Sequence, residues 1–512
     1  MSALKNNAVI GVIGAGAMGA GIAQVAAAAG HPVRLFDAAE GAAERGLANI
    51  ANGLEKQVAR GKMQAADRDA LLARIEPVGA LGDLAPAALL VEAIVERLDV
   101  KQQVFAELES ICAEDAILAS NTSSLSITAI GAALTRPQRL VGMHFFNPAP
   151  VMKLVEVISG LATDAAVAET VFATATNWGK LAVHARSTPG FIVNRVARPF
   201  YAEALRLLQE GAADAATIDA LLREAGGFRM GPFELMDLIG HDVNYAVTHS
   251  VFEAFHFDPR FKPSLIQKEL LDGGFLGRKS GRGFFDYREG AEKPAAQTAE
   301  ACTAPREVLL FGDPGIAAPL VDALRNAGIA VNSAPENDDG LLLSVGSARI
   351  ALTDGRTATE RCAEGTSDLV LLDLALDFAT CPRVALAVAD QADPAALDDA
   401  IGLMQAIGKR VSVIDDAPGM IVLRTVAMLA NEGADAVHQR VCSAAAVDTA
   451  MRYGVNYPRG PMNWADEIGP DRVLEVLDNL AVHYGDGRYR ASPLLQRVVA
   501  REGSFIESGE EQ

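Results

Sequence analysis

The stretch GAGAMG, residues 14–19, decides how the first part of this chain folds. It follows an apolar run at 7–13 that predicts a buried strand, and it opens a small-residue stretch that predicts a helix ending at Gly30. A second strand is predicted over PVRLFD, 32–37. In this setting a glycine-rich turn lets the free N–H groups of the helix meet a pyrophosphate. The sequence therefore predicts an α/β Rossmann-like unit that binds a dinucleotide, and a turn without a ligand is the alternative.

The turn and the end of the second strand also indicate which dinucleotide binds. Gly14 permits the tight turn, Gly16 admits the pyrophosphate, and Gly19 lets helix and strand pack closely. The carboxylate that ends the second strand can bond both hydroxyls of an adenosine ribose and would repel a 2′-phosphate, so NAD is favoured over NADP. The predicted cofactor contacts of this segment are Gly14, Gly16, Ala17, Met18, Gly19 and Asp37.

Length, charge and cysteine usage exclude several classes of protein. The chain has 512 residues, more than one hydrophobic core accommodates, so several domains are expected. A formal charge of -20 disfavours nucleic acid and anionic membranes as partners. The sequence has no unbroken apolar run of ~20 residues, and its five cysteines include no C-x-x-C pair. We therefore predict a cytoplasmic protein without a membrane or nucleic-acid partner and without a metal.

Two segments carry the residues suited to catalysis. His144 ends an apolar strand, and the strand that follows can bring Glu156 beside it. A histidine held by a carboxylate can take a proton from an alcohol, although a buried structural histidine is the alternative. The hydroxyl cluster SNTSSL, 120–125, offers groups that could position a substrate oxygen, or could cap the helix that follows.

Seven motifs in order over residues 7–287 resemble the L-3-hydroxyacyl-CoA dehydrogenase family: GVIGAGAMGAGIA, VEAIVE, SNTSSL, HFFNPAPVMKLVEVI, TPGFIVNR, MGPFELMD and FLGRKSGRGFFDY. The resemblance implies oxidation of the 3-hydroxyl group of an acyl-CoA with NAD. It also implies a cleft between a Rossmann-like domain and a helical domain, and the helical domain usually dimerises.

The resemblance assigns roles to individual residues. It implies His144 as the general base, Glu156 as its orienting partner, and Ser123 and Asn194 as substrate contacts. Beyond the glycine turn, the implied cofactor contacts are Glu96, Lys101, Asn121, Ser123, Asn147 and Lys279. At the CoA end the chain departs from the family, whose serine and lysine fall at Gly53 and Arg60. Arg60 and Lys62 still supply local positive charge there, which a 2-hydroxy-acid or sugar-acid dehydrogenase would not need. A non-catalytic NAD-binding protein would be expected to lack the catalytic set.

The sequence of the helical domain occurs twice. PGFIVNR at 189–195 returns as PGMIVLR at 418–424, and a shift of 229 residues aligns the two regions without a gap. The repeat replaces Asn194 by Leu423, so we expect chemistry only in the first copy. Ahead of the second copy, GDPG at 312–315 takes the place of the glycine turn. An aspartate and a proline there disfavour a pyrophosphate, and the alternative is that this unit holds another ligand.

We therefore expect a Rossmann-like NAD domain and a helical domain, followed by a degenerate Rossmann-like domain and a second helical copy, at 1–187, 188–290, 306–407 and 408–512. We expect the two helical copies to pair within the chain, and a homo-oligomer remains open. Within this family, the chain most resembles the 3-hydroxyadipyl-CoA dehydrogenases of phenylacetate breakdown, because of its length and its second helical copy. A 3-hydroxybutyryl-CoA dehydrogenase or a general fatty-acid β-oxidation enzyme is the alternative.

Overall fold

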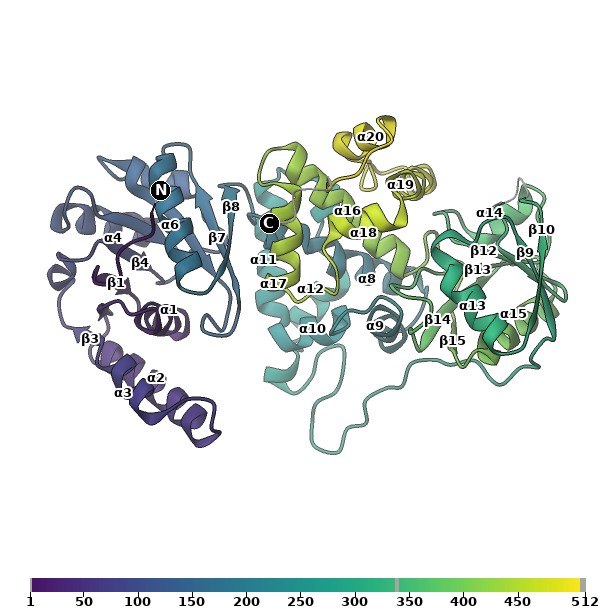
Figure 1. The fold of residues 1–512 in the computed structure, drawn as a ribbon, viewed down its shortest axis with the longest axis horizontal. Helices are drawn as coiled ribbons and strands as arrows, with labels where there is room; N and C mark the ends of the chain where they lie inside the picture. The colour runs from purple at the N-terminus through teal and green to yellow at the C-terminus, as the bar shows by residue number, and fades with distance from the viewer. Residues whose placement is uncertain (1, 337–339, 507–512) are drawn as a thin grey trace. The chain divides into compact units, whose positions relative to one another are not determined.

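The structure is a computed structural model that describes residues 2–336 and 340–506. The chain divides into two compact units, and the division does not follow the order of the sequence. One unit comprises Met1–Arg195 together with Gln439–Val455, and the other comprises Val196–His438 together with Asn456–Gln512 (Figure 1). A short piece of the second helical copy therefore belongs to the same unit as the N-terminal domain.

The first unit is built on an eight-stranded sheet in the order β3-β2-β1-β4-β5-β6-β7-β8. Neighbouring strands are parallel except β6 and β7, which are antiparallel. The strands are β1 (Ile10–Ile13), β2 (Val33–Phe36), β3 (Ile75–Val78), β4 (Leu89–Glu92), β5 (Ile117–Ser120), β6 (Leu140–Phe145), β7 (Leu154–Ser159) and β8 (Leu181–Arg186). The central strands are buried along their whole length, as expected for a parallel sheet covered by helices on both faces.

The helices of this unit are α1 (Ala17–Ala28), α2 (Ala42–Ala59), α3 (Ala65–Leu72), α4 (Leu98–Ile111), α5 (Ile127–Gly131) and α6 (Ala165–Asn177). The expected Rossmann-like fold is confirmed. Edge strand β3, which starts at Ile75, was not predicted from the sequence. Only Ile75 is buried in that strand, so its sequence lacks the apolar run that would have revealed it.

The second unit contains a seven-stranded mixed sheet in the order β10-β9-β11-β12-β13-β14-β15. Its strands are β9 (Glu307–Phe311), β10 (Ala330–Ala334), β11 (Leu343–Val345), β12 (Ala348–Leu352), β13 (Leu369–Leu372), β14 (Arg383–Val388) and β15 (Arg410–Val413), with helices α13 (Ala318–Asn326), α14 (Ala358–Ala363) and α15 (Pro394–Ala406). The turn after β9 differs from the first domain, because the carboxylate of Asp313 accepts the Gly315 N–H at 2.9 Å. A negative group thus already lies where a pyrophosphate would need a donor.

The two helical copies follow the 229-residue shift closely. The first has α7 (Val193–Val196), α8 (Arg198–Glu210), α9 (Ala215–Glu224), α10 (Pro232–Ile239), α11 (His241–Ala254) and α12 (Leu265–Asp272). The second has α16 (Val422–His438), α17 (Ala444–Gly454), α18 (Pro461–Ile468), α19 (Pro470–Tyr484) and α20 (Pro493–Ala500). Helix α8 of one copy packs against α16 of the other (Figure 1). The guanidinium of Arg424 donates to the carboxylate of Glu203 at 2.9 Å, and both side chains are fully buried.

Each helical copy also places one helix on the sheet that precedes the other copy in the sequence. Helix α17 packs on β7 and β8, where the N–H of Arg186 donates to the carbonyl of Val441 at 2.9 Å. Helix α9 packs on β14, where the N–H of Asp415 donates to the carbonyl of Ala212 at 2.9 Å. Both partners of the second bond are related to those of the first by the same 229-residue shift. The exchange of helices is therefore reciprocal.

Candidate active site

The glycine turn leaves open space at one position and none at the other two. A Cβ atom on Gly14 would lie 2.4 Å from the carbonyl oxygen of Ala93, and one on Gly19 would lie 1.8 Å from that of Gly14. A Cβ on Gly16 would meet nothing within 4 Å. Gly14 and Gly19 are thus required by the packing of the turn, whereas Gly16 keeps space clear beside the backbone, as an approaching pyrophosphate requires.

The surroundings of the turn fit NAD. Helix α1 starts at Ala17 with no side-chain cap and no acidic residue in its first turn, so its N-terminal N–H groups and positive dipole end are available to phosphates. Asp37, at the end of β2, accepts the N–H of Ala15 at 2.7 Å and that of Ala39 at 2.9 Å. These bonds fix the carboxylate beside the turn, where the ribose of the dinucleotide would lie.

The antiparallel pairing of β6 and β7 sets His144 directly opposite Glu156. The imidazole Nδ1 lies 2.6 Å from the Glu156 carboxylate oxygen Oε2, and the histidine is only 5% exposed. The other oxygen, Oε1, accepts the N–H groups of Ile192 at 3.1 Å and Val193 at 3.0 Å. An ionised Glu156 can only accept, so in that state Nδ1 of His144 donates the N–H of this contact and Nε2 is left to accept a proton.

Ser123 and Asn194 are neighbours although 71 positions separate them in the sequence. The amide Nδ2 of Asn194 donates to the backbone carbonyl of Ser123 at 3.4 Å. Asn194 follows directly on the turn that binds Glu156, so the same loop holds the histidine's partner and this amide. The structure therefore gathers His144, Glu156, Ser123 and Asn194, all of which were expected in the site.

The hydroxyl cluster binds a carboxylate of the protein, and the residue that follows the cluster caps the next helix. Ser126 caps α5 by accepting the N–H of Ala129. The hydroxyl of Thr122 donates to Glu96 at 2.6 Å, and the N–H groups of Ser123 and Ser124 donate to the same carboxylate at 2.9 and 3.0 Å. Burial opposes ionisation of Glu96, but these bonds and the charge of Lys101 outweigh it and hold its pKa below the usual value.

One buried acid at this edge of the sheet was missed from the sequence. Glu92, at the end of β4, receives the ammonium of Lys101 at 2.6 Å and the hydroxyl of Ser120 at 2.7 Å. Lys101 also lies 3.2 Å from Glu96, so it connects the two carboxylates. The signal was an acid closing the otherwise apolar strand LLVE, and such an acid needs a buried partner.

Comparison with known proteins identifies the family. Residues 9–188 match the NAD binding domain of 3-hydroxyacyl-CoA dehydrogenase, and residues 190–287 and 419–509 match its C-terminal domain. Residues 350–418 match the reduced Rossmann-fold domain of 3-hydroxybutyryl-CoA dehydrogenase. A protein of Escherichia coli named 3-hydroxyadipyl-CoA dehydrogenase is 45% identical over 98% of both chains. This chain belongs to the 3-hydroxyacyl-CoA dehydrogenase family.

Solved structures agree with this assignment. A crystal structure titled 3-hydroxybutyryl-CoA dehydrogenase from Escherichia coli superposes with a TM-score of 0.88 at 44% identity, covering 97% of this chain and 99% of that one. A probable 3-hydroxybutyryl-CoA dehydrogenase of Bacillus subtilis is 43% identical over 54% of this chain and 96% of its own length. The family is thus met in a long and a short form, and this chain is an NAD-dependent dehydrogenase of the long form.

In this dehydrogenase, the second helical copy completes the wall behind the catalytic pair. The guanidinium of Arg195, which follows Asn194, donates to the side chain of Gln439 at 2.9 Å. Burial, together with the nearby charge of Glu156, raises the pKa of the Cys442 thiol to about 12. Gln439 and Cys442 come from the segment that joins the first unit, and no motif indicates that they lie beside His144 and Glu156.

The copy retains the architecture of the catalytic site without its chemistry. At the shift of 229, Asp373 stands in the position of His144, Ala385 in that of Glu156, and Leu423 in that of Asn194. The Asp373 carboxylate directly accepts the N–H groups of Ile421, Val422 and Leu423, at 3.0, 2.7 and 3.1 Å. The turn that Glu156 binds in the first copy is therefore bound by Asp373 in the second, and no imidazole is present.

Several predicted site residues are not brought to the catalytic pair by any contact within the first unit. Gly53 lies on α2, exposed and without a side chain, and Arg60 and Lys62 follow it on the surface. Asn147 is also exposed. Lys279 lies in the second unit, where its ammonium pairs with Asp242. Their roles towards CoA and NAD stay predictions. Asn121 is held at the end of β5, where its side-chain oxygen accepts the N–H of Phe145 at 2.8 Å.

The described residues offer neither a metal-binding group nor a membrane-spanning helix. Among residues 2–336 and 340–506, no group of three or more histidine, cysteine, aspartate or glutamate side chains could hold a metal ion. No helix in the same ranges has the length and apolar character to span a membrane.

Proposed function

We propose that this enzyme oxidises the 3-hydroxyl group of an L-3-hydroxyacyl-CoA to the ketone, with 3-hydroxyadipyl-CoA as its substrate in phenylacetate catabolism. The observation that carries the chemistry is the 2.6 Å contact between His144 and Glu156, made beside Ser123 and Asn194. These groups supply a base, its orienting acid, and polar atoms for a substrate oxygen within one unit.

In the proposed mechanism the imidazole Nε2 of His144 takes the hydroxyl proton of the substrate. Glu156 keeps the ring in the required tautomer and stabilises the imidazolium as it forms. Asn194 and Ser123 hold the substrate oxygen against the base. NAD, when bound at the Gly16 turn, supplies the acceptor for the hydride that leaves the same carbon. Burial of the His144 side chain favours this proton transfer, because it excludes competing water.

The choice of substrate rests on the name of a full-length relative. The Escherichia coli protein that matches 98% of this chain is named for 3-hydroxyadipyl-CoA, whereas an Escherichia coli structure of the same length and the short Bacillus subtilis relative are named for 3-hydroxybutyryl-CoA. The test is kcat/KM for both thioesters at saturating NAD, followed by NADH absorbance. We expect a preference of about tenfold or more for the adipyl substrate, the ratio that one good polar contact provides. Equal values or the reverse order would support the 3-hydroxybutyryl enzyme.

Replacing the proposed base tests the mechanism. His144→Ala should lower kcat by at least ~100-fold, the usual scale for a general base, and leave NAD affinity nearly unchanged. Steady-state kinetics and NAD titration give the two readouts. Leu423→Asn, at the matching position to Asn194, is the control and should keep wild-type kinetics. Near-normal turnover of His144→Ala would remove His144 from the role.

The proposed CoA contacts can be tested separately from the chemistry. Arg60→Glu combined with Lys62→Glu should raise KM for an acyl-CoA by about tenfold, because these exposed cations would face the phosphates of CoA. The matched substrate is the acyl-pantetheine thioester, which lacks those phosphates. Its KM should not change. If both substrates lose affinity equally, the two cations do not recognise the nucleotide part of CoA.

We also propose that the two helical copies form a pseudo-dimer inside one chain. The buried Arg424–Glu203 pair between α16 and α8 supports it, as does the reciprocal placement of α17 and α9. In the short relatives the helix equivalent to α17 would have to come from a second chain. The four domain boundaries expected from the sequence, the contact of Lys279 with NAD and the cytoplasmic location stay predictions.

A further inference from the structure

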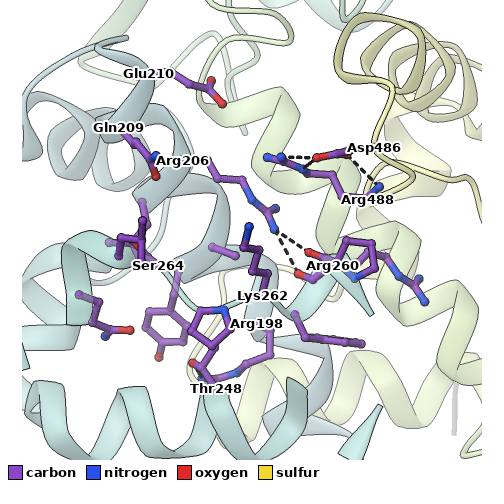
Figure 2. Close-up of a pocket in the computed structure, with 18 of the residues that line it drawn as sticks. Arg198, Arg206, Gln209, Glu210, Thr248, Arg260, Lys262, Ser264, Asp486 and Arg488 are labelled. Carbon is purple, nitrogen blue, oxygen red and sulfur yellow. Dashed lines mark hydrogen bonds and ion pairs between the residues drawn. The ribbon is translucent and has the colours of Figure 1, made fainter. Parts of the chain in front are cut away.

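A cavity of about 570 Å³ opens in the helical part of the second unit, and none of the residues that line it is assigned to catalysis. Its walls come from α8, from the segment 259–265, from α11 and from the segment 484–488. The volume lies within the range of small-molecule sites. Figure 2 shows the side chains of Arg198, Arg206, Lys262 and Arg488 arranged around it.

Arg198 is the unusual member of this lining. It is only 6% exposed, and its guanidinium donates to the hydroxyl of Thr248 at 3.1 Å and stacks 4.9 Å from the ring centre of Tyr201. Its Nε atom is buried without a hydrogen-bond partner, and no carboxylate of the described residues pairs with it. Burial accordingly lowers the pKa of Arg198. Since buried charges are ordinarily paired, this cation calls for an anion.

The other charges around the cavity are compensated, with one exception. Arg206 pairs with Glu203, Arg488 with Asp486, and Arg260 with Asp258, Glu432 and Asp435, while Glu210 binds Arg424. Lys262 has no ion-pair partner within the described part of the chain. The cavity therefore carries two uncompensated positive charges on a protein whose net charge is -20.

A second unpaired polar atom lies in the same cavity. The hydroxyl Oγ of Ser264 is buried and has no hydrogen-bond partner. Apolar and aromatic side chains, from Tyr201, Leu205, Phe261 and Leu265, form another part of the walls, together with the amides of Gln209 and Gln267. A ligand that satisfied these walls would carry an anionic head and an apolar body.

The internal repeat shows that Arg198 and Thr248 are not required by the fold. The positions 229 residues on from them hold Ala427 and Leu477, so the second copy builds the equivalents of α8 and α11 without this polar pair. The shift falls to 228 residues before the last helix, where Ser264 and Ser492 directly precede α12 and α20 and Lys262 corresponds to Arg490. Helix packing therefore does not explain the buried cation of Arg198.

We propose that this cavity binds an organic anion, with a carboxylate or phosphate group on Arg198 and Lys262 and an apolar body against Tyr201 and Phe261. All residues that line this cavity belong to the second unit, and we expect its occupant to act as an effector or a stabilising ligand and not as a reactant.

Calorimetric titration of the full-length protein at low salt tests the proposal, with hexanoate and inorganic phosphate as probes and hexanol as the neutral control. One anion should bind per chain, and hexanol should not bind. Phosphate alone would identify a phosphoryl group, and hexanoate alone a carboxylate with an apolar chain. Arg198→Met should weaken binding by about tenfold or more, the scale of one charge-assisted hydrogen bond. Lys5→Gln, an exposed single-charge change in the first unit, should not alter it.

Stability supplies a readout that distinguishes a ligand-binding arginine from a structural one. Removing an unpaired buried cation should leave the Tm of the ligand-free protein equal or higher, whereas removing a structural arginine would lower it. If Arg198→Met does not fold, Lys262→Gln and Ser264→Ala decide the matter. No binding of either anion to the wild type, or wild-type affinity in the Arg198→Met protein or in both of the other variants, would overturn the proposal.

Discussion

At the residue scale, the second copy has Asp373, which binds a helix terminus, at the position where the first copy has the proposed base His144. Asp373 is fully buried against the N-terminal end of α16. Burial raises its pKa to about 6, although the N–H groups of Val422, Leu423 and Ile421 favour the charged form. The second copy therefore trades a histidine that needs a partner acid for an acid that binds the helix directly.

This substitution predicts a pH dependence of stability. The pKa of Asp373 is higher in the folded state than in the unfolded state. The stabilisation that Asp373 gives the folded state is therefore fully present below about pH 4 and is lost as pH rises through 6. Relative to Asp373→Asn, which does not titrate, the wild type should lose about 3 kcal/mol of unfolding free energy between about pH 4 and pH 7. Urea unfolding of both proteins at several pH values measures this. A difference that is constant, or that grows with pH, would contradict it.

Residue identity explains why the catalytic pair could be predicted and its surroundings could not. His144 and Glu156 lie on successive apolar strands, and antiparallel pairing alone brings them together. Glu92 carries a local signal, an acid closing an apolar strand, whose meaning depends on a lysine that only folding brings near. Gln439 and Cys442 lie more than 240 positions from Arg195 and carry no motif, so nothing local predicts their place.

At the element scale, the docking of α17 depends on a glycine. A Cβ atom on Gly454 would lie 2.7 Å from Leu154 on β7 and 3.0 Å from Val193, which binds Glu156. Gly454→Ala should therefore push α17 off β7, lower kcat several-fold and destabilise the first unit by about 1–3 kcal/mol, the usual cost of overpacking. Thermal unfolding and steady-state kinetics measure both effects. Gly79→Ala, where a Cβ meets nothing within 4 Å, is the matched control and should be silent.

Most helices and strands could be predicted from the sequence. Helix starts at Pro232 and the strand, turn and helix around GAGAMG follow from proline, glycine and apolar period. The exchange of α9 and α17 could not be predicted, because a repeat shows that a helix occurs twice but does not show which sheet each copy covers. Strand β7 is buried over five of its six residues, and an apolar strand does not indicate which helix covers it.

At the scale of the whole molecule, the inactive half should be necessary for the active one. A fragment ending at Gly290 lacks Gln439–Val455, which belongs to the same unit as the catalytic pair. As a monomer it exposes the face of β7 and β8 that α17 covers, so we expect little turnover and a tendency to associate. Gel filtration and specific activity of the fragment against the full chain check this. A monomeric fragment with full activity would refute the idea that the copy completes the site.

The reciprocal placement of α9 and α17 within one chain has a kinetic consequence. Two separate subunits that completed each other's sites would lose activity when diluted below their dissociation constant, whereas two halves joined by a peptide meet at a fixed effective concentration. If the proposed pairing within one chain holds, we expect catalysis to be independent of how much enzyme a cell holds. We also expect one working site for every two folded copies.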